Sequence, residues 1–152
     1  MKLCCDVLST LGSRTLVTAE SCTGGGIGAA LTAIPGSSAI YKGGIISYTN
    51  WVKNILLGVD LQLLDREGAV SAPVAEAMAS GARKALQADI AVSVTGLAGP
   101  GGDDYGNPVG TVYIGYSDEV QTLSRKFMFA GDRDSVRKQA VVEALQFVLD
   151  LI

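Results

Sequence analysis

The chain has 152 residues, of which 48% are hydrophobic and 18% are charged, and its net charge is −3. This length and apolar content fit a single domain, residues 1–152, with a substantial core. The acidic balance gives no general attraction to nucleic acid or to an anionic membrane, and no segment approaches the roughly 18 apolar residues of a membrane span.

Helices and strands are expected to alternate in the first half of the chain. Gly12 ends the first predicted helix, and Pro35-Gly36-Ser37 breaks the second. The patterns predict helices over 2–12, 24–33, 50–57 and 60–66, and strands over 14–19 and 39–48.

The second half begins with a helix whose predicted N-cap is Ser71 and ends with a long helix that starts near Asp132. Strands are predicted over 89–95, 109–117 and 121–129, with a hairpin turn at 117–119. The alternation of helices and strands in the first half, followed by a hairpin, predicts an α/β fold. We expect a three-layer α/β/α domain with a mixed, mostly parallel sheet of about five to six strands.

Histidine is absent, and the three cysteines are Cys4, Cys5 and Cys22. Without histidine or a Cys-x-x-Cys pair, we expect no metal site. An odd number of cysteines with an adjacent pair is not a disulfide framework, so we expect a reducing compartment and a cytoplasmic location.

The segment from Thr18 to Gly26 places Ser21 between a predicted strand and a helix that glycines open. The start of a helix supplies backbone N–H groups and partial positive charge, which suit a phosphate or a developing oxyanion. A nucleophilic serine in a chain without histidine needs another base, and lysine is the obvious candidate. Two alternatives remain: Ser21 caps the helix, or Cys22 is the nucleophile.

The glycines after Ser21 also match the G-x-G-x-x-G/A pattern of dinucleotide-binding folds, over 24–29. That site needs a carboxylate about 20 residues further on, and no acidic residue occurs from Ser21 to Val59. We therefore expect no dinucleotide cofactor.

Two later strands are predicted to end near Ser21, at Tyr48 and Thr95. If they run parallel to the first strand, their carboxyl ends meet at one edge of the sheet, where ligands of such folds bind. Lys53, with its pKa lowered by burial, would then accept the proton of Ser21, and the Tyr48 hydroxyl would relay it. In the alternatives, Lys53 is a solvated helix residue and Asn50 is only a helix cap.

The glycine-rich segment 96–102 and two arginines complete the candidate site. The segment suits a backbone cradle for phosphate or sugar, or is a plain tight turn. Arg133 and Arg137 lie one helical turn apart and can share a face of the last helix. They are interpreted either as a pair that binds a phosphate or as solvated surface charge.

Five segments in this order resemble the C-terminal domain of the CinA competence/damage-inducible family, of the nicotinamide-nucleotide amidase type. They cover 18–25, 44–50 with Lys53, 68–71, 95–102 continuing to 108–112, and 131–133 with Val136 and Arg137. The stretch 103–107 departs from the family pattern. The resemblance implies deamidation of nicotinamide mononucleotide to nicotinate mononucleotide and ammonia, without metal or organic cofactor. It assigns the nucleophile to Ser21, with Tyr48 and Lys53 as the other catalytic residues.

The resemblance also implies which residues bind the substrate. Backbone N–H groups after the nucleophile would hold the oxyanion, and the glycine-rich segment with an arginine would hold the nucleotide. The expected binding set is Thr23, Gly24, Gly25, Asn50, Thr95, Gly96, Gly99, Gly101, Gly102, Arg133 and Arg137.

Two rival functions remain. One is a binding module for pyridine nucleotides or phosphate ligands that performs no turnover. The other is an accessory to DNA processing, against which the acidic balance counts. Helix faces rich in glycine and alanine, and the long apolar final helix, make a homodimer reasonable.

Overall fold

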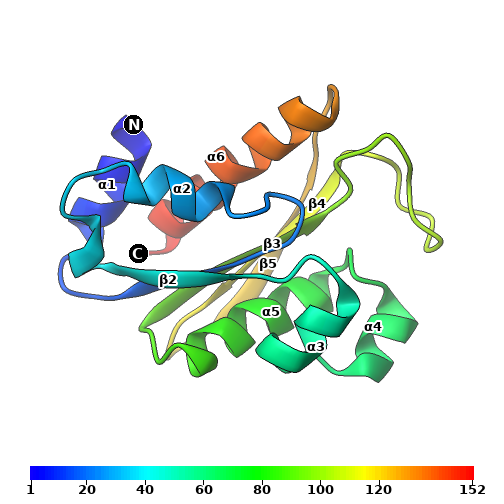
Figure 1. The fold of residues 1–152 in the computed structure, drawn as a ribbon, viewed down its shortest axis with the longest axis horizontal. Helices are drawn as coiled ribbons and strands as arrows, with labels where there is room; N and C mark the ends of the chain where they lie inside the picture. Colours follow the sequence, from blue (N-terminus) through cyan, green and yellow to red (C-terminus); the bar gives the residue numbers. More distant parts are fainter.

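Five strands form one sheet in the middle layer of the computed structural model, which describes residues 1–152 (Figure 1). The elements in chain order are α1 (Lys2–Leu11), β1 (Leu16–Glu20), α2 (Gly26–Thr32), the short 3-10 helix η1 (Ser37–Ala39), β2 (Tyr41–Ile46), α3 (Asn50–Leu57), α4 (Leu61–Glu67), α5 (Ala72–Ala85), β3 (Ile90–Gly96), β4 (Thr111–Ser117), β5 (Thr122–Met128) and α6 (Arg133–Leu151).

The strand order in the sheet is β2-β1-β3-β4-β5. β1 pairs in parallel with both β2 and β3, whereas β4 is antiparallel to β3 and to β5. Four strands therefore point the same way and only β4 opposes them. This confirms the predicted mixed, mostly parallel sheet, with five strands. The predicted hairpin turn is also confirmed, because Asp118 Oδ1 accepts the N–H groups of Val120 and Gln121 at 2.8 Å.

Helices cover both faces of the sheet, which confirms the three layers. Figure 1 shows α1, α2 and α6 on one face and α3, α4 and α5 on the other. Neighbouring strand residues point to opposite faces, so Leu16 and Val92 join the core under α6 whereas Val17 and Ala91 join the core under α5. All five residues of β1 are buried, as expected for a central strand with helices on both sides.

Two boundaries near the carboxyl edge of the sheet differ from the predicted ones. The helix expected from residue 24 begins instead at Gly26. Gly24 and Gly25 have φ values of +59° and +98°, which belong to a turn and are incompatible with a right-handed helix. The strand expected over 39–48 ends at Ile46, which leaves Ser47 and Tyr48 in the connection to α3. None of the helices combines the length and apolar character needed to cross a membrane.

Candidate active site

Ser21 lies immediately after β1, at the edge where the three parallel strands end. Its N–H donates to Val94 O of β3 at 3.0 Å, and the Ser47 N–H after β2 donates to Glu20 O at 2.8 Å. These bonds extend the parallel pairing just past the strand ends and hold Ser21 between β2 and β3. The N-cap of α2 is Gly25, so the alternative in which Ser21 caps this helix is wrong.

Lys53 extends from α3 to Ser21 and is 1% exposed, so the alternative of a solvated lysine is wrong. Its Nζ lies 3.1 Å from Ser21 Oγ, 2.8 Å from Ser47 O and 3.4 Å from Tyr48 O. Helix α3 is capped by Thr49, whose hydroxyl accepts the N–H of Val52, and not by an asparagine at its first position.

The surroundings of the Lys53 amine favour its neutral form. Burial lowers the pKa of Lys53 from its usual value of 10.5 to about 8. None of its three hydrogen-bond partners is a carboxylate. A neutral amine has two protons and one lone pair. The backbone carbonyls of Ser47 and Tyr48 can take the two protons, which leaves the lone pair for the hydroxyl proton of Ser21.

The turn after Ser21 contains backbone donors that are free. The N–H groups of Cys22, Thr23 and Gly25 donate to no acceptor in the protein, whereas the Gly24 N–H donates to Ser21 O at 3.1 Å. Free N–H groups that directly follow a nucleophile are the usual donors to an oxyanion. The Gly24 N–H, expected to be one of them, is instead used to close the turn.

Glu20 holds this turn, and the sequence pattern pointed to no role for it. Its buried carboxylate accepts the Thr23 hydroxyl at 2.7 Å and the N–H groups of Ile27 and Gly28 at 2.8 and 3.0 Å. The first turn of α2 is thus capped by a carboxylate from β1 and is not open to a ligand's phosphate. The sequence did contain a signal for this role, because Glu20 is an acidic residue at the end of an otherwise uncharged buried strand. A buried carboxylate needs hydrogen-bond donors close by.

A cleft of about 400 Å³ opens beside Ser21. It is lined by Ser21, Cys22, Gly24, Ile46, Tyr48, Arg133 and Arg137. These residues come from β2, the turn after β1, the connection before α3, and the start of α6. The cleft is therefore formed by segments that are far apart in the sequence, at 21–48 and 133–137.

The two arginines of the cleft make different contacts. Arg137 donates from Nε to Cys22 O at 3.0 Å and from Nη2 to Thr23 O at 3.3 Å, so it supports the turn that carries the free N–H groups. Arg133 is exposed and bridges Gly99 O, at 2.7 Å from Nη1, and the Tyr48 hydroxyl, at 3.2 Å from Nη2. The exposed Arg133 guanidinium is therefore the one that can give up its present hydrogen bonds and donate to a ligand instead.

Tyr48 contacts Lys53 through its backbone carbonyl, and its side chain lies in the cleft wall. The hydroxyl accepts a hydrogen bond from Arg133 and makes none with Ser21 or Lys53. The expected proton relay through this hydroxyl therefore has no counterpart among the hydrogen bonds of the site.

Most of the glycine-rich segment lies away from the cleft. Gly99 reaches it through the bond from Arg133. Thr95 instead donates its hydroxyl to Ala69 O at 2.7 Å, and a Cβ at Gly102 would meet Asn107 O. The expected binding residues that do not line the cleft are Thr23, Gly25, Asn50, Thr95, Gly96, Gly99, Gly101 and Gly102.

Cys22, the alternative nucleophile, is buried beside the cleft. Burial raises the pKa of its thiol to about 11. Since the thiolate is the reactive form, this thiol is a poor nucleophile at neutral pH.

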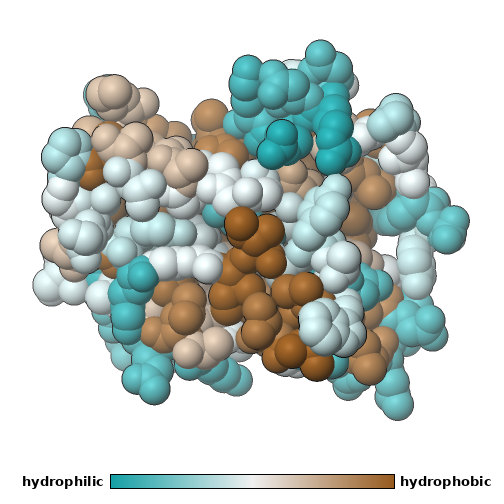
Figure 2. Space-filling view, viewed as in Figure 1, coloured by the Kyte–Doolittle hydropathy of each residue, from teal (hydrophilic) through white to brown (hydrophobic).

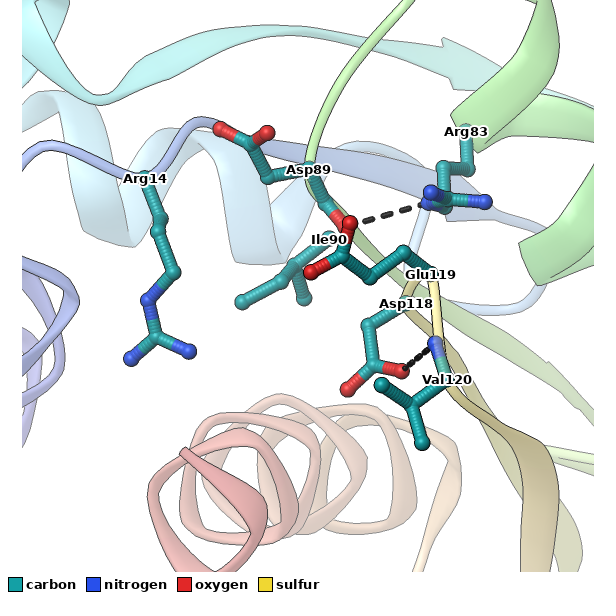
Figure 3. Close-up of a pocket in the computed structure, with 7 residues that line it drawn as sticks. All are labelled: Arg14, Arg83, Asp89, Ile90, Asp118, Glu119 and Val120. Carbon is teal, nitrogen blue, oxygen red and sulfur yellow. Dashed lines mark hydrogen bonds between the residues drawn. The ribbon is translucent and has the colours of Figure 1, made fainter.

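A second cavity, of about 220 Å³, lies at the opposite end of the sheet, where β1 and β3 begin (Figure 3). Two of its charged side chains bond to nearby backbone groups: Arg83 donates to Asp89 O at 3.1 Å, and Asp118 accepts the N–H of Val120. It contains none of the expected site residues.

Comparison with known proteins agrees with the resemblance seen in the sequence. The family model of the CinA C-terminal domain matches residues 4–152. The Pseudomonas putida protein named nicotinamide-nucleotide amidohydrolase PncC is 47% identical over 156 residues, which cover 96% of this chain and 98% of that protein. A CinA-like protein of Thermosynechococcus vestitus is 50% identical over 138 residues, which are 89% of this chain and 33% of that protein. The chain thus spans about a third of the length of such curated relatives.

Solved structures show the same fold. A CinA superfamily protein of Escherichia coli has a TM-score of 0.96 and 37% identity, with 99% of this chain and 88% of that chain covered. A competence/damage-inducible protein of Agrobacterium tumefaciens has a TM-score of 0.94 and 38% identity, with 99% and 93% covered. Together with the family model, these matches confirm the resemblance.

Replacing Glu20 by glutamine tests how much the turn depends on the carboxylate. The amide NH₂ of Glu20→Gln would face one of the donors that the carboxylate now accepts, so we expect a loss of about 2 kcal/mol in the free energy of unfolding, measured with urea. Glu76→Gln is the matched control, since the Glu76 carboxylate accepts a single side-chain hydroxyl, from Ser124. Equal losses in the two variants would contradict this account.

Proposed function

The chain belongs to the family of CinA C-terminal domains, and from this premise we propose that it is an amidohydrolase that converts nicotinamide mononucleotide to nicotinate mononucleotide and ammonia. The observation that carries the proposal is the 3.1 Å contact between Lys53 Nζ and Ser21 Oγ, in which a buried amine with a pKa of about 8 faces a serine hydroxyl. The identity to the Pseudomonas putida amidohydrolase supports the substrate.

In the first half of the proposed reaction, Ser21 is acylated. The neutral Lys53 amine takes the hydroxyl proton of Ser21, and Oγ attacks the carboxamide carbon of the substrate. The resulting oxyanion is held by free N–H groups among those of Cys22, Thr23 and Gly25. The Lys53 ammonium gives its proton to the amide nitrogen, and collapse of the tetrahedral species breaks the C–N bond and releases ammonia.

The second half releases the acid and restores the enzyme. Lys53, neutral again, takes a proton from water, whose oxygen attacks the ester carbonyl of the acylated Ser21. The C–O bond to Ser21 breaks, and Oγ recovers the proton from Lys53. The product leaves as a carboxylate, and no step of this cycle uses a metal or an organic cofactor.

The nucleotide part of the substrate is proposed to occupy the cleft above Ser21. Arg133 exchanges its bonds to Gly99 and Tyr48 for the phosphate, since its guanidinium is exposed and bound only to neutral acceptors. Arg137 stays on the carbonyls of the nucleophile turn. The Tyr48 ring forms the wall against which the nicotinamide ring packs.

Three variants test the catalytic assignment by ammonia release from nicotinamide mononucleotide. We expect Ser21→Ala and Lys53→Ala each to lower the rate by at least about 1,000-fold, because each removes a group that the reaction needs. Cys5→Ala, which removes an exposed thiol outside the site, is the matched control.

The outcomes separate the alternatives. Full activity in Ser21→Ala together with loss in Cys22→Ala would transfer the nucleophile to the cysteine. Binding of nicotinamide mononucleotide by calorimetry, without ammonia release by the unmodified chain, would favour a module that only binds the nucleotide.

The reaction rate should rise with pH through the pKa of Lys53. Below pH 8 the amine is protonated and cannot accept the Ser21 proton, so kcat/KM should fall about tenfold per pH unit on the acid side of a midpoint near 8. A profile of kcat/KM against pH measures this. A rate independent of pH between 6 and 9, when chemistry is shown to limit it, would contradict the role of Lys53 as base.

Arg133 should discriminate substrates by their phosphate. Arg133→Gln removes a charge-assisted contact of about 2 kcal/mol, so we expect kcat/KM for nicotinamide mononucleotide to fall by about 30-fold, mainly through KM. Nicotinamide riboside, which has no phosphate, should be affected much less. Equal losses with both substrates would refute phosphate binding by Arg133.

A further inference from the structure

The cavity at the amino ends of β1 and β3 lies at the opposite end of the sheet from Ser21 (Figure 3). Four segments of the chain line it: the connection before β1, α5, the start of β3 and the turn between β4 and β5. Five of its seven lining residues are charged. Figure 2, by contrast, shows apolar side chains gathered near the centre of the molecule, over the region where β2 leads into α3. The cavity is thus a charged site that is separate from the cleft.

Two carboxylates hold the walls of this cavity in place. Asp89 accepts the N–H of Thr15 at 2.7 Å and the Thr15 hydroxyl at 3.0 Å, which ties the start of β3 to the start of β1. Asp118 accepts the Tyr116 hydroxyl and the N–H of Val120, each at 2.8 Å, which fixes the turn between β4 and β5. The shape of the cavity is therefore set by the fold itself.

Three other charged groups of the cavity have unused hydrogen-bonding capacity. The Nε atoms of Arg14 and Arg83 donate to backbone carbonyls, but the terminal nitrogens of both guanidinium groups donate to no acceptor. The Glu119 carboxylate accepts no hydrogen bond, and none of the chain's ion pairs includes any of these three residues. Figure 3 shows the Glu119 side chain pointing from its turn toward the space between the two arginines. Donors and an acceptor of opposite charge are thus available to one ligand.

The mixture of charges selects the kind of ligand. Two guanidinium groups and three carboxylates line the cavity, so the carboxylates repel a simple anion and the guanidinium groups repel a simple cation. A zwitterion can satisfy both kinds of group, because guanidinium groups bind carboxylates and a glutamate carboxylate accepts from an ammonium. The charges therefore favour a small molecule that has one carboxylate and one ammonium.

We propose that this cavity binds a free α-amino acid with a small apolar side chain. The terminal nitrogens of Arg14 and Arg83 donate to the ligand carboxylate, and Glu119 accepts from the ligand ammonium. The side chain of the ligand packs against Ile90 and Val120, the two apolar residues of the lining. The volume of about 220 Å³ lies below the roughly 300–1,000 Å³ of pockets for larger ligands, which fits a molecule of this size. This binding does not depend on the proposed reaction at Ser21.

L-Valine is the probe, and two compounds that each lack one of its charged groups are the controls. Calorimetric titration of the full chain should show saturable binding of L-valine. Isovalerate lacks the ammonium and isobutylamine lacks the carboxylate, so each should bind at least about tenfold more weakly through the loss of charge-assisted contacts. Absence of saturable binding by L-valine, or equal binding by either control compound, would overturn the proposal.

Variants and amide signals locate the bound amino acid. We expect Arg14→Gln and Glu119→Gln, both at exposed positions, to bind L-valine at least about tenfold more weakly, with unchanged far-ultraviolet circular dichroism. Arg66→Gln, at an exposed position on α4 outside the cavity, is the matched control and should bind as the unmodified chain does. In nuclear magnetic resonance spectra, L-valine should shift the amide signal of Val120 and leave those of the turn after Ser21 in place. Undiminished binding by either cavity variant, or shifts confined to the turn after Ser21, would show that the proposal is wrong.

Discussion

The burial of one amine without a carboxylate partner is the constraint on which the candidate site depends. Removing Lys53 from water lowers its pKa to about 8, and this shift from 10.5 corresponds to a cost of roughly 3 kcal/mol at pH values below 8. The cost fades as pH rises from the folded pKa toward the unfolded one, because the unfolded chain then no longer gains from binding the proton. The connection after β2 offsets part of it with two carbonyl groups, although the nearby Ser47 hydroxyl is itself buried without a hydrogen-bond partner.

The turn around Ser21 also contains polar backbone groups that have no partner within the protein. Three N–H groups near Ser21 are left without acceptors, and such a turn keeps its shape only if the rest of it is tightly held. Glu20 holds it from the side of the sheet and Arg137 from the side of α6. The opposite charges of these two residues are directed to backbone and hydroxyl groups, not to each other. Neither has to leave its partners for a substrate to bind.

The pairing of Ser21 with Lys53 could be predicted because it follows from topology. Parallel strands end at one edge of the sheet, so Ser21 after β1 lies beside the connection after β2, and that connection leads directly into α3, which carries Lys53. The role of Glu20 could not be predicted, since no spacing rule links a strand residue to N–H groups seven and eight positions later. The Tyr48 hydroxyl and most of the glycine-rich segment were misplaced for a related reason. The direction of a side chain in a connection, and the course of a long loop, depend on contacts such as the bond from Arg133 that have no local pattern.

The hydrogen bonds from Arg137 to the turn after Ser21 join residues 114 and 115 positions apart in the chain. During synthesis, Ser21 and Lys53 leave the ribosome well before α6 exists, so the parallel strands can pair while this support is missing. The turn with its free N–H groups acquires its last support only when the final helix docks. The turn beside Ser21 is therefore fully supported only after a helix has docked that is synthesised later than all five strands of the sheet.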